Sequence, residues 1–142
     1  MCFNQQYIQD PIQVLLNNTI IQEVKDTKFL KVWIDSNLTW EKHVQYLIQK
    51  LSRLCYALRV LAKISPIELL KSVYFGYIHS VISYGIMTWG SSSKSTQVLK
   101  LQKRIIKIMK QVSIRTESKK VFTELQILPV TCMFHSPEQK FL

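Results

Sequence analysis

The chain has 142 residues, of which 47% are hydrophobic and 11% aromatic, so one modest core is expected and general disorder is excluded. The formal net charge of +10 favours a polyanionic partner, either nucleic acid or an anionic membrane surface. The three cysteines and three histidines are scattered without metal-ligand spacing, so the sequence predicts neither a disulfide framework nor a metal site. No basic stretch followed by an apolar run opens the chain, which predicts an intracellular protein, in the nucleus or cytoplasm, rather than a secreted one.

Three short segments near the N-terminus have the composition of β-strands. They are Ile12–Leu16, Thr19–Val24 and Lys28–Ile34. Asn17-Asn18 predicts a tight hairpin turn, because asparagine tolerates positive φ. In the third segment, Leu30, Val32 and Ile34 are expected to face the core. Three strands are too few to stand alone, so they form either the edge of a larger sheet or a small sheet covered by helices; residues 1–11 are expected to fray.

A long amphipathic helix is predicted from Trp40 to about Lys63, with Thr39 as its N-cap. Its apolar residues recur at the i, i+3, i+4, i+7 spacing of a helix. They are Val44, Leu47, Ile48, Leu51, Leu54, Cys55, Leu58 and Leu61.

A second helix opens at Ser65-Pro66-Ile67-Glu68, which has the pattern of a capping box with proline at the first helical position. It is apolar nearly all round and is predicted to run to Trp89, with Gly90 after its end; Gly85 is the alternative end. No charged residue lies between Ser72 and Ser93, a length that could cross a membrane. Serines, a histidine and two glycines interrupt this stretch, so a buried central helix is predicted and no membrane partner.

A third helix, capped by Ser95 and fading near Val112–Thr116, separates an apolar arc from a basic one at 100° per residue. The segment from Lys94 to Lys120 holds nine basic residues and one acid, which is +8 of the total charge. The basic arc is either a solvated face or a surface for polyanions. Its candidate nucleic-acid-binding residues are Lys100, Lys103, Arg104, Lys107 and Lys110.

A short helix is predicted over Lys119–Gln126, and Leu128-Pro129 marks a boundary before a last turn or helix at Val130–His135. Ser136-Pro137-Glu138 has the pattern to cap one further turn. The predicted fold class is therefore mainly α: a two- to three-stranded antiparallel β element followed by a bundle of four to five helices. The predicted domains are 1–36 for the β segment and 37–142 for the helices.

The residues offer little catalytic chemistry. No two aspartates lie near each other in sequence, so the usual two-metal pattern of phosphoryl transfer has no local source. The chain has neither a glycine-rich phosphate loop nor a G-x-S-x-G motif. His43 and His79 are expected to be core or interface histidines with satisfied hydrogen bonds. No catalytic residue is predicted.

Five blocks in order resemble the C-terminal end of non-LTR retrotransposon reverse transcriptases, especially the jockey-like group. The blocks are KFLKVWIDSNLTWEKHVQYLIQKLS, CYALRVL, YFGYIHSVISYGIMTWGSSS, LQKRIIK and VFTELQIL. The likeness covers roughly Ile12 to Pro129, and its specificity lies in the number of blocks in register. Lys31 stands where the family usually has glycine.

The resemblance implies that the first strands complete the edge of a polymerase palm and that the helices form the thumb and the region after it. In that family the thumb holds the template–primer duplex by its backbone. Lys100, Lys103, Arg104 and Lys107 lie at the LQKR block, so the implied partners are RNA, DNA or an RNA–DNA heteroduplex, together with the missing palm and fingers. The family's catalytic aspartate pair is upstream and absent here. Mg²⁺ and dNTPs are therefore expected only for the full-length enzyme, and this chain is expected to be inactive alone.

Two rival interpretations remain open. The chain is either a helical protein-interaction module or a non-functional relic of a transposon open reading frame. Absence of heteroduplex binding at low salt would favour the interaction module over a nucleic-acid-binding function. Hydrogen exchange on the purified chain would separate a poorly folded relic from a stable domain.

Overall fold

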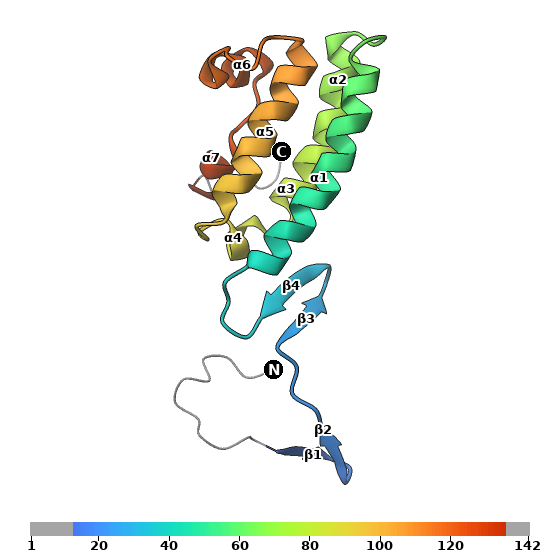
Figure 1. Cartoon of the computed structure of the whole chain (residues 1–142), viewed down its shortest axis with the longest axis vertical. Coiled ribbons are helices and arrows are strands. Elements are labelled where there is room, and N and C mark those ends of the chain that lie inside the picture. Colours follow the sequence, from blue (N-terminus) through green and yellow to red (C-terminus); the bar gives the residue numbers. More distant parts are fainter. Residues whose placement is uncertain (1–12, 136–142) are drawn as a thin grey trace. The chain divides into compact units, whose positions relative to one another are not determined.

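The computed structural model describes residues 13–135 (Figure 1). Within them, short antiparallel strands are followed by helices, which confirms the predicted mainly α fold class. The chain divides into two compact units between His43 and Val44, whereas the sequence predicted a boundary after residue 36. The frayed entry and the last turn at Ser136 that the sequence predicts lie outside the described residues.

The first unit contains two separate β-hairpins. β1 (Val14–Leu16) pairs with β2 (Thr19–Ile21), and β3 (Asp26–Phe29) pairs with β4 (Val32–Asp35). Asn17 and Asn18 have φ of 50° and 62°, which confirms the predicted hairpin turn. All side chains of β1 and β2 are exposed.

The single strand predicted over Lys28–Ile34 is wrong, because the chain turns back at Leu30-Lys31. These residues have φ of 46° and 65°, and Phe29 pairs with Val32 directly across the turn. Both residues adopt the left-handed conformation, in which glycine is the least strained residue. Leucine and lysine are not typical of such turns, so the sequence does not predict one here. Leu30, expected in the core, is 69% exposed.

Asp35 organises the entry into the first helix, α1 (Glu41–Leu61). Its carboxylate accepts hydrogen bonds from the N–H of Thr39 at 2.9 Å, the hydroxyl of Thr39 at 2.9 Å and the N–H of Trp40 at 3.0 Å. Slight burial raises the pKa of Asp35, but these hydrogen bonds outweigh it and hold the pKa below its ordinary value. Trp40 has φ of 61° and lies outside the helix, contrary to the prediction.

The second long helical segment is a rod that is α-helical at both ends and π-helical in the middle. α2 (Ile67–Val73) continues into a π-helical segment, η2 (Tyr74–His79), and then into α3 (Ser80–Ser83). Gly85, with φ of 66°, ends the rod and separates it from α4 (Ile86–Trp89). The predicted continuous helix to Trp89 is therefore wrong, and Gly85 is its end.

The two predicted serine caps are also wrong. Pro66 occupies the N-cap of α2, and no side chain caps that helix. α5 (Ser95–Lys110) has Lys94 at its N-cap, again without a side-chain hydrogen bond, while Ser95 is already helical and buried. Sequence patterns place such helix ends only to within one or two residues.

The last two helices confirm the predictions for their regions. α6 (Ser118–Leu125) buries Val121, Phe122 and Leu125, and α7 (Val130–His135) follows the predicted proline boundary. α5 and α6 both end at a glutamine in the left-handed conformation, Gln111 and Gln126.

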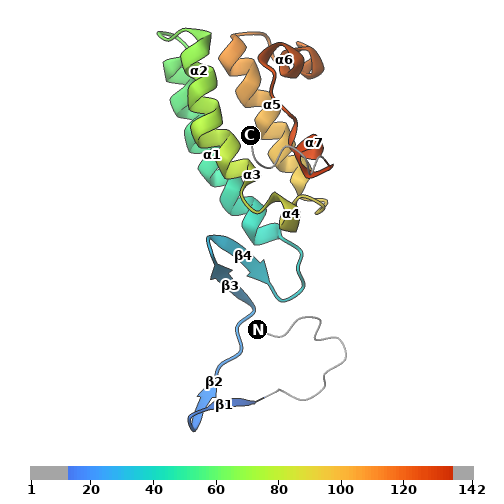
Figure 2. The same cartoon turned by 180° about the vertical axis from the view of Figure 1, so that it is seen from behind.

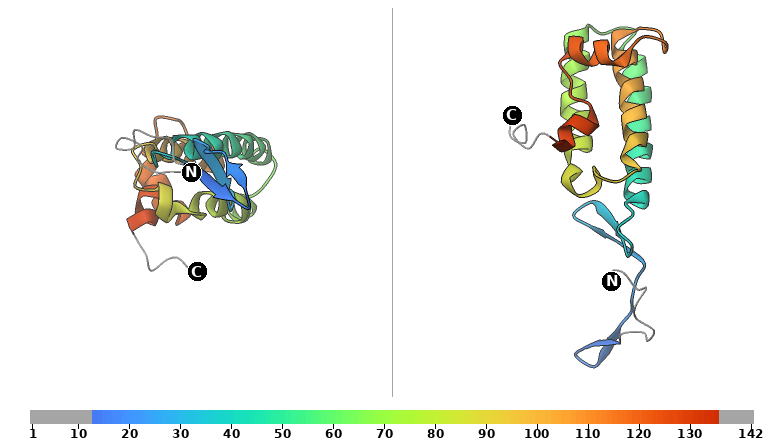
Figure 3. Two further views of the ribbon diagram at one scale, coloured as in Figure 1. Left: turned by 90° about the horizontal axis from the view of Figure 1, so that it is seen from below. Right: turned by 90° about the vertical axis from the view of Figure 1, so that its left-hand side faces the viewer.

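In the second unit, α1, the α2–α3 rod and α5 run roughly along a common axis (Figures 1 and 2). α6 crosses one end of this bundle, and α7 lies against α5, α3 and α4 (Figure 3). Apolar residues from all these helices form its core. The fully buried ones include Leu51, Leu58, Leu70, Tyr74, Ile78, Ile82, Trp89, Ile105, Ile106, Met109 and Leu125. Among residues 13–135, no helix combines the length and apolar character needed to cross a membrane.

Candidate nucleic-acid interface

α5 has one buried and one basic side, as its sequence predicts. Val98, Ile105, Ile106 and Met109 are at most 2% exposed and fix the helix against the bundle. Burial of this side leaves the opposite side to solvent, because residues three and four apart share a helix face. The exposed cations on this side are Lys100, Lys103 and Arg104, and Lys107 is half-buried.

A groove of ≈ 650 Å³ runs between this basic side and the C-terminal part of α1. Two further cations line it, Arg59 of α1 and Lys63 of the turn that follows α1, and residues 111–118 close another side. Around the groove, the described lining residues include six cations and no acid. We call this cavity the basic groove. The cations that line it are Arg59, Lys63, Lys100, Lys103, Arg104 and Lys107.

Two of the five candidate cations also have partners within the protein. Lys107 Nζ donates a hydrogen bond to the carbonyl oxygen of Ile114 at 2.7 Å, which ties the loop after α5 to the groove. Lys110 Nζ lies 2.8 Å from a carboxylate oxygen of Glu124 on α6. The structure places Lys110 outside the lining of the groove.

The pKa of the buried Cys55 thiol is influenced by two of the cations that line the groove. Burial raises the pKa of the Cys55 thiol, while the positive charges of Arg104 and Arg59 lower it and offset part of the rise. One arginine comes from α5 and the other from α1. The two helices therefore direct positive charge toward the same region of the second unit.

A groove of this kind suits a phosphate backbone. Cations that neutralise phosphates release condensed counterions, so affinity falls steeply as salt rises. Lysine and arginine contacts to phosphates position a strand without reading its bases. The basic groove thus has the chemistry for binding nucleic acid with little sequence preference.

Arg59 and Lys63 were not among the residues that the sequence analysis singled out. Arg59 lies off the apolar stripe of α1 and Lys63 lies in the turn after that helix, so the helical periodicity marks them only as surface residues. Their proximity to α5 depends on how the helices pack. No sequence pattern within one helix predicts that Arg59 and Lys63 lie close to the cations of α5.

The two histidines differ in their hydrogen bonding. Nδ1 of His43 accepts the backbone N–H of Trp33 at 3.3 Å, so one of its two ring nitrogens has the expected hydrogen bond. Nδ1 of His79 is shielded from solvent and has no hydrogen-bond partner among the residues described, contrary to that expectation. Burial lowers the pKa of both imidazoles, which favours their neutral forms.

Residues 13–135 contain no group of three or more histidine, cysteine or acidic side chains arranged to hold a metal ion. Comparisons of the chain with models of known protein families, with curated proteins and with solved structures gave no match.

Proposed function

We propose that the helical unit binds nucleic acid through the sugar–phosphate backbone, as the thumb-like part of a retrotransposon reverse transcriptase. Convergence of six cations from α1, the turn that follows it and α5 around one groove, with no acid among its described lining residues, carries the proposal. The ordered blocks that resemble the C-terminal end of that family give the basic groove a substrate, the RNA–DNA template–primer duplex.

The proposed role is to hold the duplex, with the chemistry supplied elsewhere. The resemblance places the catalytic aspartate pair upstream of the blocks that this chain shares. A primed RNA template with Mg²⁺ and dNTPs should therefore give no extension with this chain alone. Extension of the primer would overturn this part of the proposal.

The binding test is a fluorescence-anisotropy titration of a labelled RNA–DNA heteroduplex at 50 and 200 mM salt. If all six cations neutralise phosphates, affinity should fall roughly 10³-fold between these concentrations. Scrambling the base sequence should leave the affinity nearly unchanged, because backbone contacts carry no sequence information.

A matched pair of variants distinguishes binding at the groove from attraction by the net charge of the protein. Lys100→Ala removes a cation that lines the groove. Lys50→Ala removes an exposed lysine of α1 that does not line it. Only Lys100→Ala should weaken binding and make the salt slope shallower by about one. No binding at 50 mM salt, or equal losses in the two variants, would reject the groove as the site.

A second candidate function is docking on a protein partner, such as the palm of a polymerase. The β1–β2 hairpin supports it, because apolar side chains are exposed along both of its strands. Isolated two-stranded hairpins are marginal in water, and exposed apolar strand edges tend to pair with other chains. The exposed residues are Val14, Leu15, Leu16, Ile20 and Ile21, each at least 48% exposed. Replacing Leu15 and Ile20 by threonine should abolish co-purification with a co-expressed palm–fingers segment while leaving heteroduplex binding intact.

A further inference from the structure

A second, larger cleft lies in the helical unit on the side of α5 that faces α6 and α7. It has a volume of ≈ 1340 Å³, above the roughly 300–1,000 Å³ typical of small-molecule pockets. Its lining is largely apolar and comes from the α2–α3 rod, α5, α6 and the segment that leads into α7. Members from these elements include Phe75, His79, Leu99, Phe122, Ile127 and Met133.

The π-helical segment η2 forms one wall of this cleft. Its residues Phe75 and His79 both line the cleft, and their ring centroids lie 5.4 Å apart. Phe75 is 41% exposed, so a face of its ring is available to a ligand. Interruptions of α-helices by π-helical turns are frequent at functional sites.

Nδ1 of His79 is an unexplained polar atom at this wall. It is shielded from solvent and lacks a hydrogen-bond partner among residues 13–135. Such an atom destabilises the fold unless a partner is supplied.

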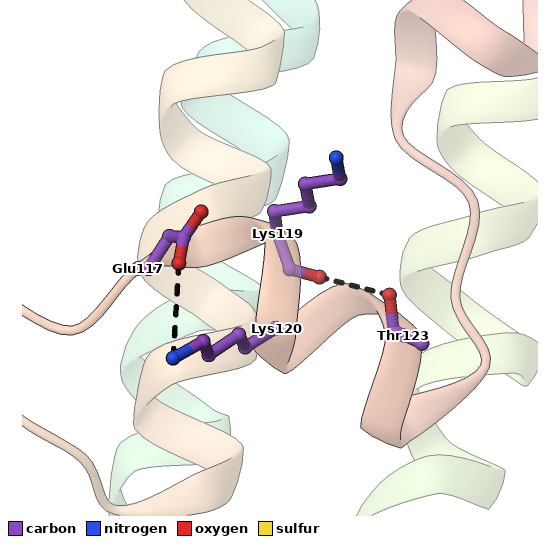
Figure 4. Close-up of polar contacts among 4 residues, drawn as sticks. All are labelled: Glu117, Lys119, Lys120 and Thr123. Atoms are coloured by element: carbon purple, nitrogen blue, oxygen red, sulfur yellow. Dashed lines mark hydrogen bonds and ion pairs between the residues drawn. The ribbon is translucent and has the colours of Figure 1, made fainter.

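The cleft adjoins the basic groove. Lys103 and Ser118 line both of them, so a strand whose phosphates lie in the groove passes the mouth of the cleft. The lining of the cleft includes a further cation, Lys119, and one acid, Glu117. Glu117 lies 4.0 Å from Lys120, and the side chain of Lys119 extends away from this pair (Figure 4). Thr123 anchors the same turn through a 3.1 Å hydrogen bond to the carbonyl of Lys119.

We propose that this cleft receives an unpaired nucleobase from the strand held in the basic groove, with the base stacked on Phe75 beside the imidazole of His79. The proposal rests on the backbone binding proposed above and adds a single-stranded nucleotide to its substrate. Base–aromatic stacking is tolerant of sequence, because every base has a flat π-face. The site therefore favours strands that carry bases without choosing among them.

The test compares two single strands of equal length and charge, one with all its bases and one fully abasic. Backbone electrostatics are the same for both, so their affinity ratio isolates the contribution of the bases. The wild-type chain should bind the base-containing strand roughly 10-fold more tightly, a typical effect of stacking one base. Phe75→Leu should abolish this ratio while leaving the affinity for the abasic strand unchanged.

Tyr77→Leu is the matched control, because Tyr77 lies in the same π-helical segment, is 63% exposed and does not line the cleft. It should keep the full ratio. Equal affinities of the wild type for the two strands, or equal loss of the ratio in both variants, would overturn the base site and leave backbone binding standing. Failure to bind either strand at low salt would instead overturn the proposed function and, with it, the base site.

A measurement on the unmodified chain completes the test independently of how the variants fold. The ¹⁵N resonance of His79 Nδ1, assigned in imidazole-labelled protein, should shift when the base-containing strand is added. It should stay in place with the abasic strand. A shift of the same size with both strands would contradict contact between the base and the imidazole of His79.

Discussion

The side-chain amide of Gln102 donates a hydrogen bond to the hydroxyl of Tyr74 at 2.9 Å, joining α5 to the π-helical segment inside the core. The same Nε2 also donates to the carbonyl of Leu128 at 2.9 Å, and Oε1 accepts the N–H of Val130 at 2.9 Å. Gln102 is fully buried. One amide therefore fixes α5, the π-helical segment and the start of α7 relative to one another.

Gln102→Leu should lower the free energy of unfolding by about 3 kcal/mol, because it leaves several buried polar groups unpaired. Urea denaturation measures this change directly. Gln97→Leu is the control, since Gln97 is an exposed residue of the same helix; its effect should stay within about 0.5 kcal/mol. Similar losses in the two variants would show that the buried network contributes little.

Tyr74 should make stability fall at alkaline pH. Burial raises the pKa of its hydroxyl to about 12, and the hydrogen bond from Gln102 offsets only part of the rise. The unfolded chain releases this proton near the ordinary tyrosine pKa of about 10. Between these values the folded state binds more protons than the unfolded state, so the free energy of unfolding decreases as pH rises.

Denaturant titrations of the wild type and Tyr74→Phe between pH 8 and 11 test this expectation. The variant should lose less stability over that range, because it lacks the shifted group. Ionisation of the lysines affects both proteins and cancels in the comparison. Parallel stability curves would contradict a raised pKa at Tyr74.

Features that lie within one helix or strand could be predicted from the sequence, whereas features that depend on the packing of several elements could not. Helical periodicity located α1, the basic side of α5 and the buried residues of α6, because it reports which face of each helix is apolar. The turn at Leu30-Lys31 escaped, since neither residue favours the positive φ that the backbone adopts there. One signal was available. Phe29 and Lys31 lie two residues apart, so a single strand would place an aromatic and a charged side chain on the same face, which does not fit a half-buried strand.

The candidate site was foreseen in part. Four of the five cations chosen on α5 line the basic groove, whereas Lys110 lies outside it and pairs with Glu124. Arg59 comes from α1 and Lys63 from the turn after it, and periodicity within α5 carries no information about neighbouring segments. The buried role of Gln102 escaped for the same reason, because its partners lie at least 26 residues away in sequence.

The ends of α5 and α6 predict opposite outcomes for the same substitution. Gln111 and Gln126 both have left-handed φ, of 54° and 56°, where glycine is less strained. The side chain of Gln111 donates to the carbonyl of Ala62, whereas Gln126 is exposed. Gln126→Gly should stabilise the protein by roughly 0.5 kcal/mol, as relief of strain exceeds the added entropy of the unfolded chain.

Gln111→Gly should destabilise it by about 1 kcal/mol, because the lost hydrogen bond to Ala62 outweighs that relief. Thermal denaturation of the two variants beside the wild type measures both shifts. An increase in melting temperature for Gln111→Gly would show that the link between α5 and the end of α1 is dispensable.

The basic groove predicts that cations from α1 act in binding together with those of α5. Arg59 lines the groove, whereas Arg53 is an exposed arginine of the same helix that does not. Arg59→Ala should weaken heteroduplex binding and reduce the salt slope by about one, the change expected from losing one phosphate contact. Arg53→Ala removes the same charge and should leave the slope unchanged.

The double variant Arg59→Ala, Lys103→Ala sharpens this prediction. If each cation neutralises its own phosphate, the double variant should reduce the slope by about two, since separate phosphate contacts contribute additively. Titrations at four salt concentrations give slopes precise enough for the comparison. A wild-type slope in Arg59→Ala, beside a reduced slope in Lys103→Ala, would confine binding to α5 and remove α1 from the interface.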